Sequence, residues 1–251
     1  MRVETETRQQ IVSHYRAHTD AYNRIWTNLE TVSDQFEETG LDGKIARLKL
    51  SYVNAVISIR TPADRQDEAL ARLVAGDDLE TAMASVNYHT QKRKYMRQSL
   101  GEVDVWEDIA VALQNGAVDR AHETALELDY IGTVKAPFIL SMLGYTEKMC
   151  IDGNALRVLG LDDYPSMDDV RQYEELCRDV RAEFPTLSEE LDPFHLHWVV
   201  FDWERSSTQN GDTVAGVQTQ SRQITRHEAW FDAALRNVTE IESIVDSLVR
   251  E

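Results

Sequence analysis

The sequence predicts an all-α protein. Only 5 prolines and 11 glycines interrupt its 251 residues, and the apolar residues mostly recur at intervals of three and four positions. This spacing places side chains on one face of a helix. A chain of this length can bury a sizeable core without disulfides or metal ions. We expect an N-terminal helical extension at 1–45, a core at 46–205, a linker or loop at 206–221 and a C-terminal helix at 222–251.

The first half of the chain indicates five helices. One apolar stripe runs from Ile11 to Phe36 and ends before Gly40, which predicts a long leading helix, either straight or bent. The block LKLSYVNAVISI at 48–59 is apolar on most sides and is typical of a buried helix. Pro62 favours the start of the next helix. We expect helices over 8–36, 48–59, 63–74, 79–86 and 91–100, the last of which carries the basic residues Lys92, Arg93, Lys94 and Arg97.

The second half continues the helical spacing with one interruption. Helices are expected over 106–113, 118–128, 135–143, 167–184 and 188–203. The stretch SSTQNGDTVAGVQTQS at 206–221 is polar and without pattern, which is typical of a loop or linker. The tail from Gln223 onward returns to helical spacing. We expect it to pack on its own domain, and the alternative is a helix that engages a partner or a second copy of the chain.

The charge balance is strongly acidic. Asp and Glu number 44 against 26 Lys and Arg, which gives a net charge of -18, and only six of the basic residues are lysine. This composition is typical of a salt-adapted cytoplasmic protein, although an acidic surface that aids solubility explains it equally well. A broad basic nucleic-acid surface is absent from the totals, but a small basic cleft can lie within an acidic surface. No signal-like or membrane-length apolar run occurs, so we expect a cytoplasmic protein without membrane contact.

The metal and cofactor candidates are few. Cys150 and Cys177 are the only cysteines, too few for a thiolate zinc or iron–sulfur site, and we expect buried thiols in a reducing compartment. His195 and His197 stand two apart on an expected helix, where they point to different faces. We therefore expect no metal site and no cofactor.

Residues 118–143 have the pattern of two helices joined by a tight turn. The helices are expected at 118–128 and 135–143, with the turn around Gly132. Such a hairpin presents backbone N–H groups at the start of a helix, where the helix dipole favours an anion such as a DNA phosphate. We expect Gly132, Thr133 and Val134 to contact DNA in this way.

These segments resemble the helix-hairpin-helix DNA glycosylase superfamily, especially its archaeal-type 8-oxoguanine glycosylases. The residues that carry the resemblance are Ile131-Gly132, Ala136, Leu143-Gly144-Tyr145, Cys-Ile-Asp152 and Leu156-Arg157-Val-Leu159. Upstream, Ala55-Val-Ile-Ser58-Ile-Arg60-Thr-Pro62 resembles the family's Leu-Ser-x-Gln-Thr turn, and Val86-Asn-Tyr-His-Thr-Gln-Lys92-Arg-Lys94-Tyr95 resembles its Phe-Tyr-x-x-Lys-Ala-x-Tyr stretch. The resemblance covers roughly 48–203 and matches the order of all three segments.

The resemblance implies a two-lobed helical enzyme that excises a damaged base from double-stranded DNA, with 8-oxoguanine the leading substrate. The damaged nucleotide is extruded into a pocket between two helical halves. By resemblance Asp152 stabilises the positive charge that develops on the sugar and activates the nucleophile. Lys135 would attack the sugar carbon and add an AP lyase step. Arg60, Lys92 and Lys94 would contact DNA, and the resemblance allows a monovalent cation on the hairpin.

The match departs from the family at the hairpin. Asp129-Tyr130 stands where the family's hairpin opens with Pro-Gly, and Pro137 falls in the first helical turn, where proline is tolerated. An ungapped alignment places Val134 where the family's lysine stands, and an offset of one residue turns a side chain by about 100° at a helix start. Lys135 is therefore either the nucleophile in an altered hairpin or a phosphate contact. Outside the family pattern Asp152 would be a helix N-cap, Arg60 a surface residue before a proline, and Lys92 and Lys94 part of a solvated helix face.

Two further functions fit the same sequence. One is a DNA-binding or base-sensing module that has kept the fold and lost the chemistry, as the altered hairpin would allow. The other is a helical protein-interaction protein that engages its partner through the C-terminal helix. Salt-dependent binding to duplex DNA separates the last from the other two, and base release separates the enzyme from the module.

Overall fold

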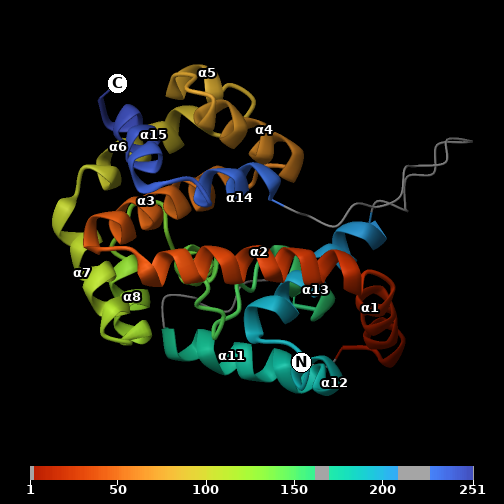
Figure 1. The fold of residues 1–251 in the computed structure, drawn as a ribbon. Coiled ribbons are helices and arrows are strands. Elements are labelled where there is room, and N and C mark those ends of the chain that lie inside the picture. The colour runs from red at the N-terminus through yellow and green to blue at the C-terminus, as the bar shows by residue number, and fades with distance from the viewer. Residues whose placement is uncertain (1–2, 162–169, 209–226, 251) are drawn as a thin grey trace, which may run out of the picture. The chain divides into compact units, whose positions relative to one another are not determined.

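The chain is helical, as the sequence predicted (Figure 1). The computed structural model describes residues 3–161, 170–208 and 227–250, and these residues contain no β-strand. They form two compact units: unit 1 comprises 1–26 and 146–226, and unit 2 comprises 27–145 and 227–251. These units divide the chain at other positions than the expected regions, because the long helix α2 (Thr19–Glu38) begins in unit 1 and ends in unit 2.

Unit 1 is organised around its longest complete helix, α13 (Pro193–Thr208). This helix packs against α1 (Thr5–Ala17), α10 (Gly153–Val158), α11 (Val170–Glu183) and α12 (Pro185–Ser188). Its core is aromatic, since Trp26 stacks on the His195 ring at a centroid distance of 4.0 Å and meets Trp198 edge-on at 5.5 Å. Trp198 and Phe194 are buried, so the tryptophan belongs to the core of this unit.

Unit 2 is built around α3 (Leu41–Ser58), which is buried along most of its length. That burial explains why the block at 48–59 has no polar face. Six helices in the described part of unit 2 pack against α3. They are α4 (Ala63–Val74), α6 (His89–Leu100), α7 (Val103–Gln114), α9 (Lys135–Ser141), α14 (Glu228–Ala234) and α15 (Val238–Arg250). Two short helices, α5 (Leu79–Ala82) and α8 (Val118–Ala125), complete the unit.

Several expected boundaries are wrong. The leading helix is two helices, α1 and α2, separated at His18. The helix expected from residue 188 begins instead at Pro193, because proline fits the first turn of a helix, where its missing N–H costs nothing. The expected linker at 206–221 lies outside the described residues except for 206–208, which end α13.

The C-terminal tail forms two helices rather than one. Within unit 2, α14 packs on α4 and α15 packs on α3. Trp230 and Ile241 are fully buried there. The prediction that the tail packs on its own domain is therefore confirmed for the described residues.

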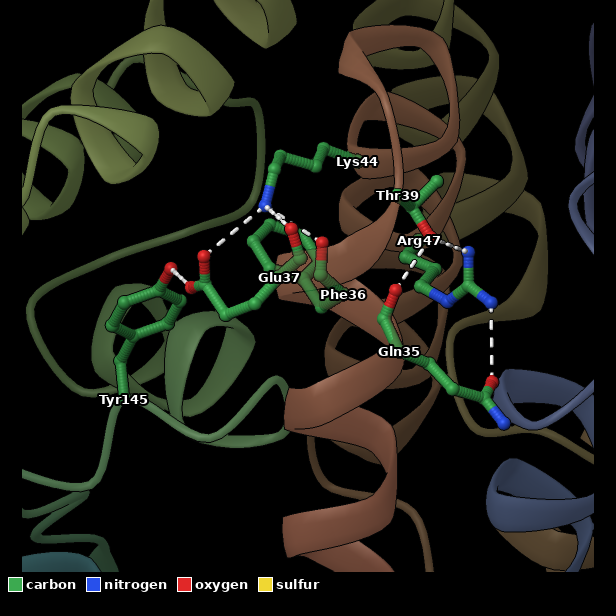
Figure 2. Close-up of polar contacts among 7 residues, drawn as sticks. All are labelled: Gln35, Phe36, Glu37, Thr39, Lys44, Arg47 and Tyr145. Atoms are coloured by element: carbon green, nitrogen blue, oxygen red, sulfur yellow. Dashed lines mark hydrogen bonds and ion pairs between the residues drawn. The ribbon is translucent and has the colours of Figure 1, made fainter.

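Two buried cations join the end of α2 to the start of α3 (Figure 2). Lys44, 3 % exposed, donates to the Phe36 carbonyl at 2.7 Å and pairs with the Glu37 carboxylate at 3.4 Å. The Tyr145 hydroxyl donates to the other Glu37 oxygen at 2.6 Å. Arg47 donates to the side-chain oxygens of Thr39 at 3.4 Å and Gln35 at 3.2 Å. These contacts hold the connection between the two helices.

Within the described residues, no helix has the length and apolar character needed to cross a membrane.

Candidate functional site at the end of helix α3

The helix, turn and helix expected at 118–143 are present in unit 2. The helices are α8 and α9, and the turn between them includes Tyr130 in the left-handed region with φ of 67°. Tyr130 stacks on Tyr95 of α6 at a centroid distance of 5.3 Å. The Tyr52 hydroxyl of α3 donates to the Asp129 carbonyl at 3.1 Å. The turn is therefore fixed to α3 and α6 on the side away from its tip.

The tip of the turn has unused backbone donors. The Gly132 carbonyl accepts the N–H groups of Lys135 at 2.8 Å and Ala136 at 3.0 Å, which starts α9. The N–H groups of Gly132, Thr133 and Val134 donate to no acceptor among the described residues. Gly132 is exposed, and a Cβ at this position would meet nothing within 4 Å. Gly132 is therefore open to a ligand, whereas Thr133 is buried, with 8 % exposure.

Lys135 begins α9 and is partly buried. Its Nζ donates to the Ser58 Oγ at 2.8 Å and lies 4.5 Å from the centroid of the Phe138 ring. Ser58 is the last residue of α3 and donates its own proton to the Ala55 carbonyl at 2.7 Å. The amine is thus held between a hydroxyl oxygen and an aromatic face.

Lys92 lies inside unit 2 rather than on its surface. Its side chain is 0 % exposed, and Nζ donates to the carbonyls of Ile57 at 3.0 Å and Ile59 at 2.5 Å and to the Thr61 Oγ1 at 2.9 Å. Burial, with the charge of Lys135 as a second cause, lowers the pKa of Lys92 to about 7. The expected contact between Lys92 and a DNA phosphate is wrong for this structure, because the ammonium is enclosed and its three donors are used.

Arg60 and Tyr88 come together beyond the end of α3. Both have left-handed backbone, with φ of 53° and 57°, and the Asn87 side chain donates to the Arg60 carbonyl at 2.6 Å. The Arg60 guanidinium lies 5.9 Å from the Tyr88 ring centroid, and Tyr88 is 55 % exposed. Left-handed backbone is costly for side chains of this size and persists where its surroundings fix it. Tyr88 was missed in the sequence because an exposed tyrosine has no periodic signal.

The basic run on α6 does not form a continuous surface. Lys94 is exposed, with Nζ 5.8 Å from the Tyr95 ring centroid, and it remains available for a phosphate contact. Arg93 pairs with the Glu80 carboxylate at 3.2 Å. Together with the burial of Lys92, this leaves Lys94 and Arg60 as the exposed cations among the predicted DNA contacts.

Asp152 lies in unit 1 and caps α10. One carboxylate oxygen accepts the N–H groups of Asn154 and Ala155, both at 3.0 Å, and the other accepts the Asn154 side-chain amide at 2.8 Å. Arg157, one turn later, donates to the buried Glu204 carboxylate at 2.6 Å. The N-cap interpretation of Asp152 is therefore realised, and its catalytic role stays a prediction.

The histidines of α13 are part of the aromatic core. Burial lowers the pKa of His195 to about 4, against the opposing charge of Asp192, so the ring stacked on Trp26 is neutral at physiological pH. No group of three or more His, Cys, Asp and Glu side chains that could hold a metal ion occurs in the part of the chain that the structure describes.

Comparison with protein-family models, with curated proteins and with solved structures found no match to this chain. The resemblance to the helix-hairpin-helix glycosylases therefore depends on the residues quoted from the sequence.

Proposed function

We propose that this protein is a DNA glycosylase that removes a damaged base, 8-oxoguanine being the first candidate, and that Lys135 is its amine nucleophile. The observation that carries the proposal is the position of Lys135: it starts the second helix of the hairpin, is partly buried, and donates to Ser58. An amine that is partly buried and lies near a second cation resembles the lysines that form Schiff bases.

The chemistry would proceed as follows. The neutral Lys135 Nζ attacks C1′ of the deoxyribose, and the bond between C1′ and the base breaks with its electron pair on the base, which takes up a proton. The attached amine loses one proton. The nitrogen lone pair then forms a C1′=N bond as the ring C1′–O4′ bond opens, and O4′ takes up a proton. Hydride from borohydride reduces this iminium to a stable secondary amine, which makes the intermediate detectable.

The DNA contact would combine the hairpin tip with the exposed pair at the end of α3. The free N–H groups of Gly132, Thr133 and Val134 suit a phosphate oxygen. Arg60 and the exposed Tyr88 present a cation and an aromatic face side by side, which suits the gap left by an extruded base. This arrangement needs no broad basic surface, and it therefore agrees with a net charge of -18.

The test is borohydride trapping on duplex DNA that contains 8-oxoguanine, at high salt, with free-base release measured in parallel. Wild-type protein and Lys49→Gln, which changes a lysine of α3 outside the predicted DNA contacts, should both form a trapped adduct. Lys135→Gln should form none, and Asp152→Asn should lose base release. Equal trapping by Lys135→Gln would overturn the assignment of the nucleophile. Absence of both the adduct and base release on this DNA would overturn the proposed substrate.

One observation favours a second candidate, the DNA-binding module without chemistry. The Asp152 carboxylate is fully engaged by Asn154 and Ala155, as a purely structural cap would be. That candidate predicts salt-dependent binding to duplex DNA with no release of base and no adduct. A helical interaction protein predicts no such binding.

A further inference from the structure

The surroundings of Lys135 contain two groups that the sequence did not point to as partners of this lysine. Ser58 Oγ accepts an N–H of Lys135 at 2.8 Å while its own proton lies toward the Ala55 carbonyl at 2.7 Å. A hydroxyl whose proton is already donated offers only its lone pairs. Ser58 therefore takes one N–H of the amine and leaves the nitrogen lone pair of a neutral amine directed elsewhere.

Lys92 fixes the segment that carries Ser58. Its ammonium holds the carbonyl of the residue before Ser58, Ile57, and the carbonyl of the residue after it, Ile59. A third donor reaches the Thr61 Oγ1 at 2.9 Å. Cations are favoured at the C-terminal end of a helix, where carbonyls lack partners. Lys92 thus fixes the position of Ser58, the residue that accepts the hydrogen bond from Lys135.

Lys135 and Lys92 are two cations that interact. Lys135 is the only charged residue in α9 (KAPFILS), and its charge acts on Lys92. On α6 the neighbouring Arg93 pairs with Glu80, and Lys94 is exposed. Because the pKa of Lys92 is about 7, Lys92 exerts little charge on Lys135 at higher pH, and its role there is to hold the Ser58 segment.

We propose that Ser58 and Lys92 are positioning residues for the Lys135 amine: Ser58 orients it by accepting one N–H, and Lys92 fixes Ser58 through the carbonyls on either side of it. The same Ser58 oxygen can accept the single N–H of an iminium formed on Lys135. The reaction that this amine serves is the proposed glycosylase step, and the inference rests on it. The arrangement itself belongs to the DNA-free protein and can be measured there.

The experiment is competitive acetylation of the DNA-free protein with acetic anhydride from about pH 6 to pH 11. Mass spectrometry of the peptides then gives the pH midpoint for each lysine. The variants are Ser58→Ala, Ser58→Thr and Lys92→Met, with Lys94→Met as the matched control on α6. The melting temperature of each variant reports its folding.

Both positions should shift the Lys135 midpoint downward. Ser58→Ala removes an acceptor that favours the charged form, so the midpoint should fall by about half a unit, roughly a threefold change in the neutral fraction at fixed pH. Lys92→Met releases the carbonyls on either side of Ser58, so the acceptor is no longer held in place and the midpoint should fall in the same direction. Ser58→Thr should restore the wild-type midpoint, and Lys94→Met should leave it unchanged.

Both shifts are required. An unchanged or raised midpoint in either Ser58→Ala or Lys92→Met would overturn the inference. If Lys92→Met does not fold, Ser58→Ala and Ser58→Thr decide it: a lowered midpoint that threonine restores supports the inference, and any other result overturns it. Borohydride trapping of wild type on damaged DNA tests the function separately, because absence of an adduct would reject the glycosylase while the acetylation result still stands.

Discussion

Unit 2 contains two buried lysines whose acceptors lie near the ends of successive helices, and their surroundings differ in one respect. Lys44 donates to the Phe36 carbonyl near the end of α2, and Lys92 donates to the Ile57 carbonyl near the end of α3. Lys44 also has a carboxylate partner, since Glu37 lies 3.4 Å from its Nζ. Lys92 has no ion pair among those of the described residues, and the charge acting on it is that of Lys135.

The comparison separates a structural lysine from a functional candidate. A cation that satisfies helix carbonyls and has a carboxylate nearby serves the fold, as Figure 2 shows for Lys44. A buried cation beside a second cation costs free energy on folding, because both charged forms are disfavoured. Such perturbed groups concentrate at functional sites, although structural networks also produce them. The region around Lys92 and Lys135 is therefore the part of unit 2 to which we assign the proposed reaction.

The largest expected effect is that Lys92, unlike Lys44, makes the free energy of unfolding depend on pH. The pKa of Lys92 falls from 10.5 to about 7 on folding, so the unfolded chain binds more protons between these values and stability rises with pH across that window. The contribution of Lys92 should be on the order of 5 kcal/mol, since each unit of pKa change corresponds to about 1.4 kcal/mol. Below about pH 7 both states are protonated and the penalty is fully present.

Urea unfolding in a pH series would measure this contribution. Lys92→Met should lose the rise in stability from Lys92 between about pH 7 and pH 10, whereas Lys44→Met should retain it. The two variants are matched in chemistry and differ only in which lysine is removed. A wild-type slope in Lys92→Met would mean that Lys92 does not titrate in this range, and the contrast between the two lysines would fail.

The second prediction concerns the source of the like charge. Lys135→Met removes the repulsion on Lys92 at about pH 6, where Lys92 is protonated, and leaves little to remove at about pH 9. The gain in free energy of unfolding that Lys135→Met gives over wild type should therefore be larger at about pH 6 than at about pH 9, by about 1 kcal/mol. Lys94→Met is the control, because that exposed lysine should give the same difference at both pH values. Equal effects of Lys135→Met at both pH values would show that the two lysines are not coupled.

Much of the fold could be predicted from the sequence, because apolar spacing reports which faces are buried. The helix over 63–74 has the expected bounds, and the block at 48–59 is the buried centre of unit 2. The break at His18 was missed because the apolar stripe continues in phase across it. Spacing records which residues face the core and gives no information on where the backbone bends.

The candidate site was predicted less well, for a different reason. Lys92 was assigned to the surface from its basic neighbours, but a lysine can be buried when oxygen acceptors surround it, and those acceptors come from another helix. Ser58 and Tyr88 had no local signal either, since their roles depend on contacts across α3 and α6. Contacts between residues far apart in the sequence carry the site, and one sequence does not record them.

The smallest expected effect concerns Glu37, the carboxylate partner of Lys44. Glu37→Gln keeps the shape of the side chain and removes the charge that balances Lys44. The Glu37 side chain is 55 % exposed, so the loss of stability should be only about 0.5 kcal/mol and should shrink at high salt. The Tyr145 hydroxyl can still donate to the amide oxygen, which limits other changes.

A double-mutant cycle with Lys44→Met isolates the charge pair itself. We expect a coupling of about 0.5 kcal/mol at low salt that falls towards zero at high salt. A much larger, salt-independent coupling would mean that Glu37 stabilises Lys44 as a buried pair, and the α2 end would then depend on electrostatics as strongly as the α3 end does. A small coupling would leave the carbonyl acceptors as the main partners of Lys44, so that the two lysines share one structural role and differ through Lys135 alone.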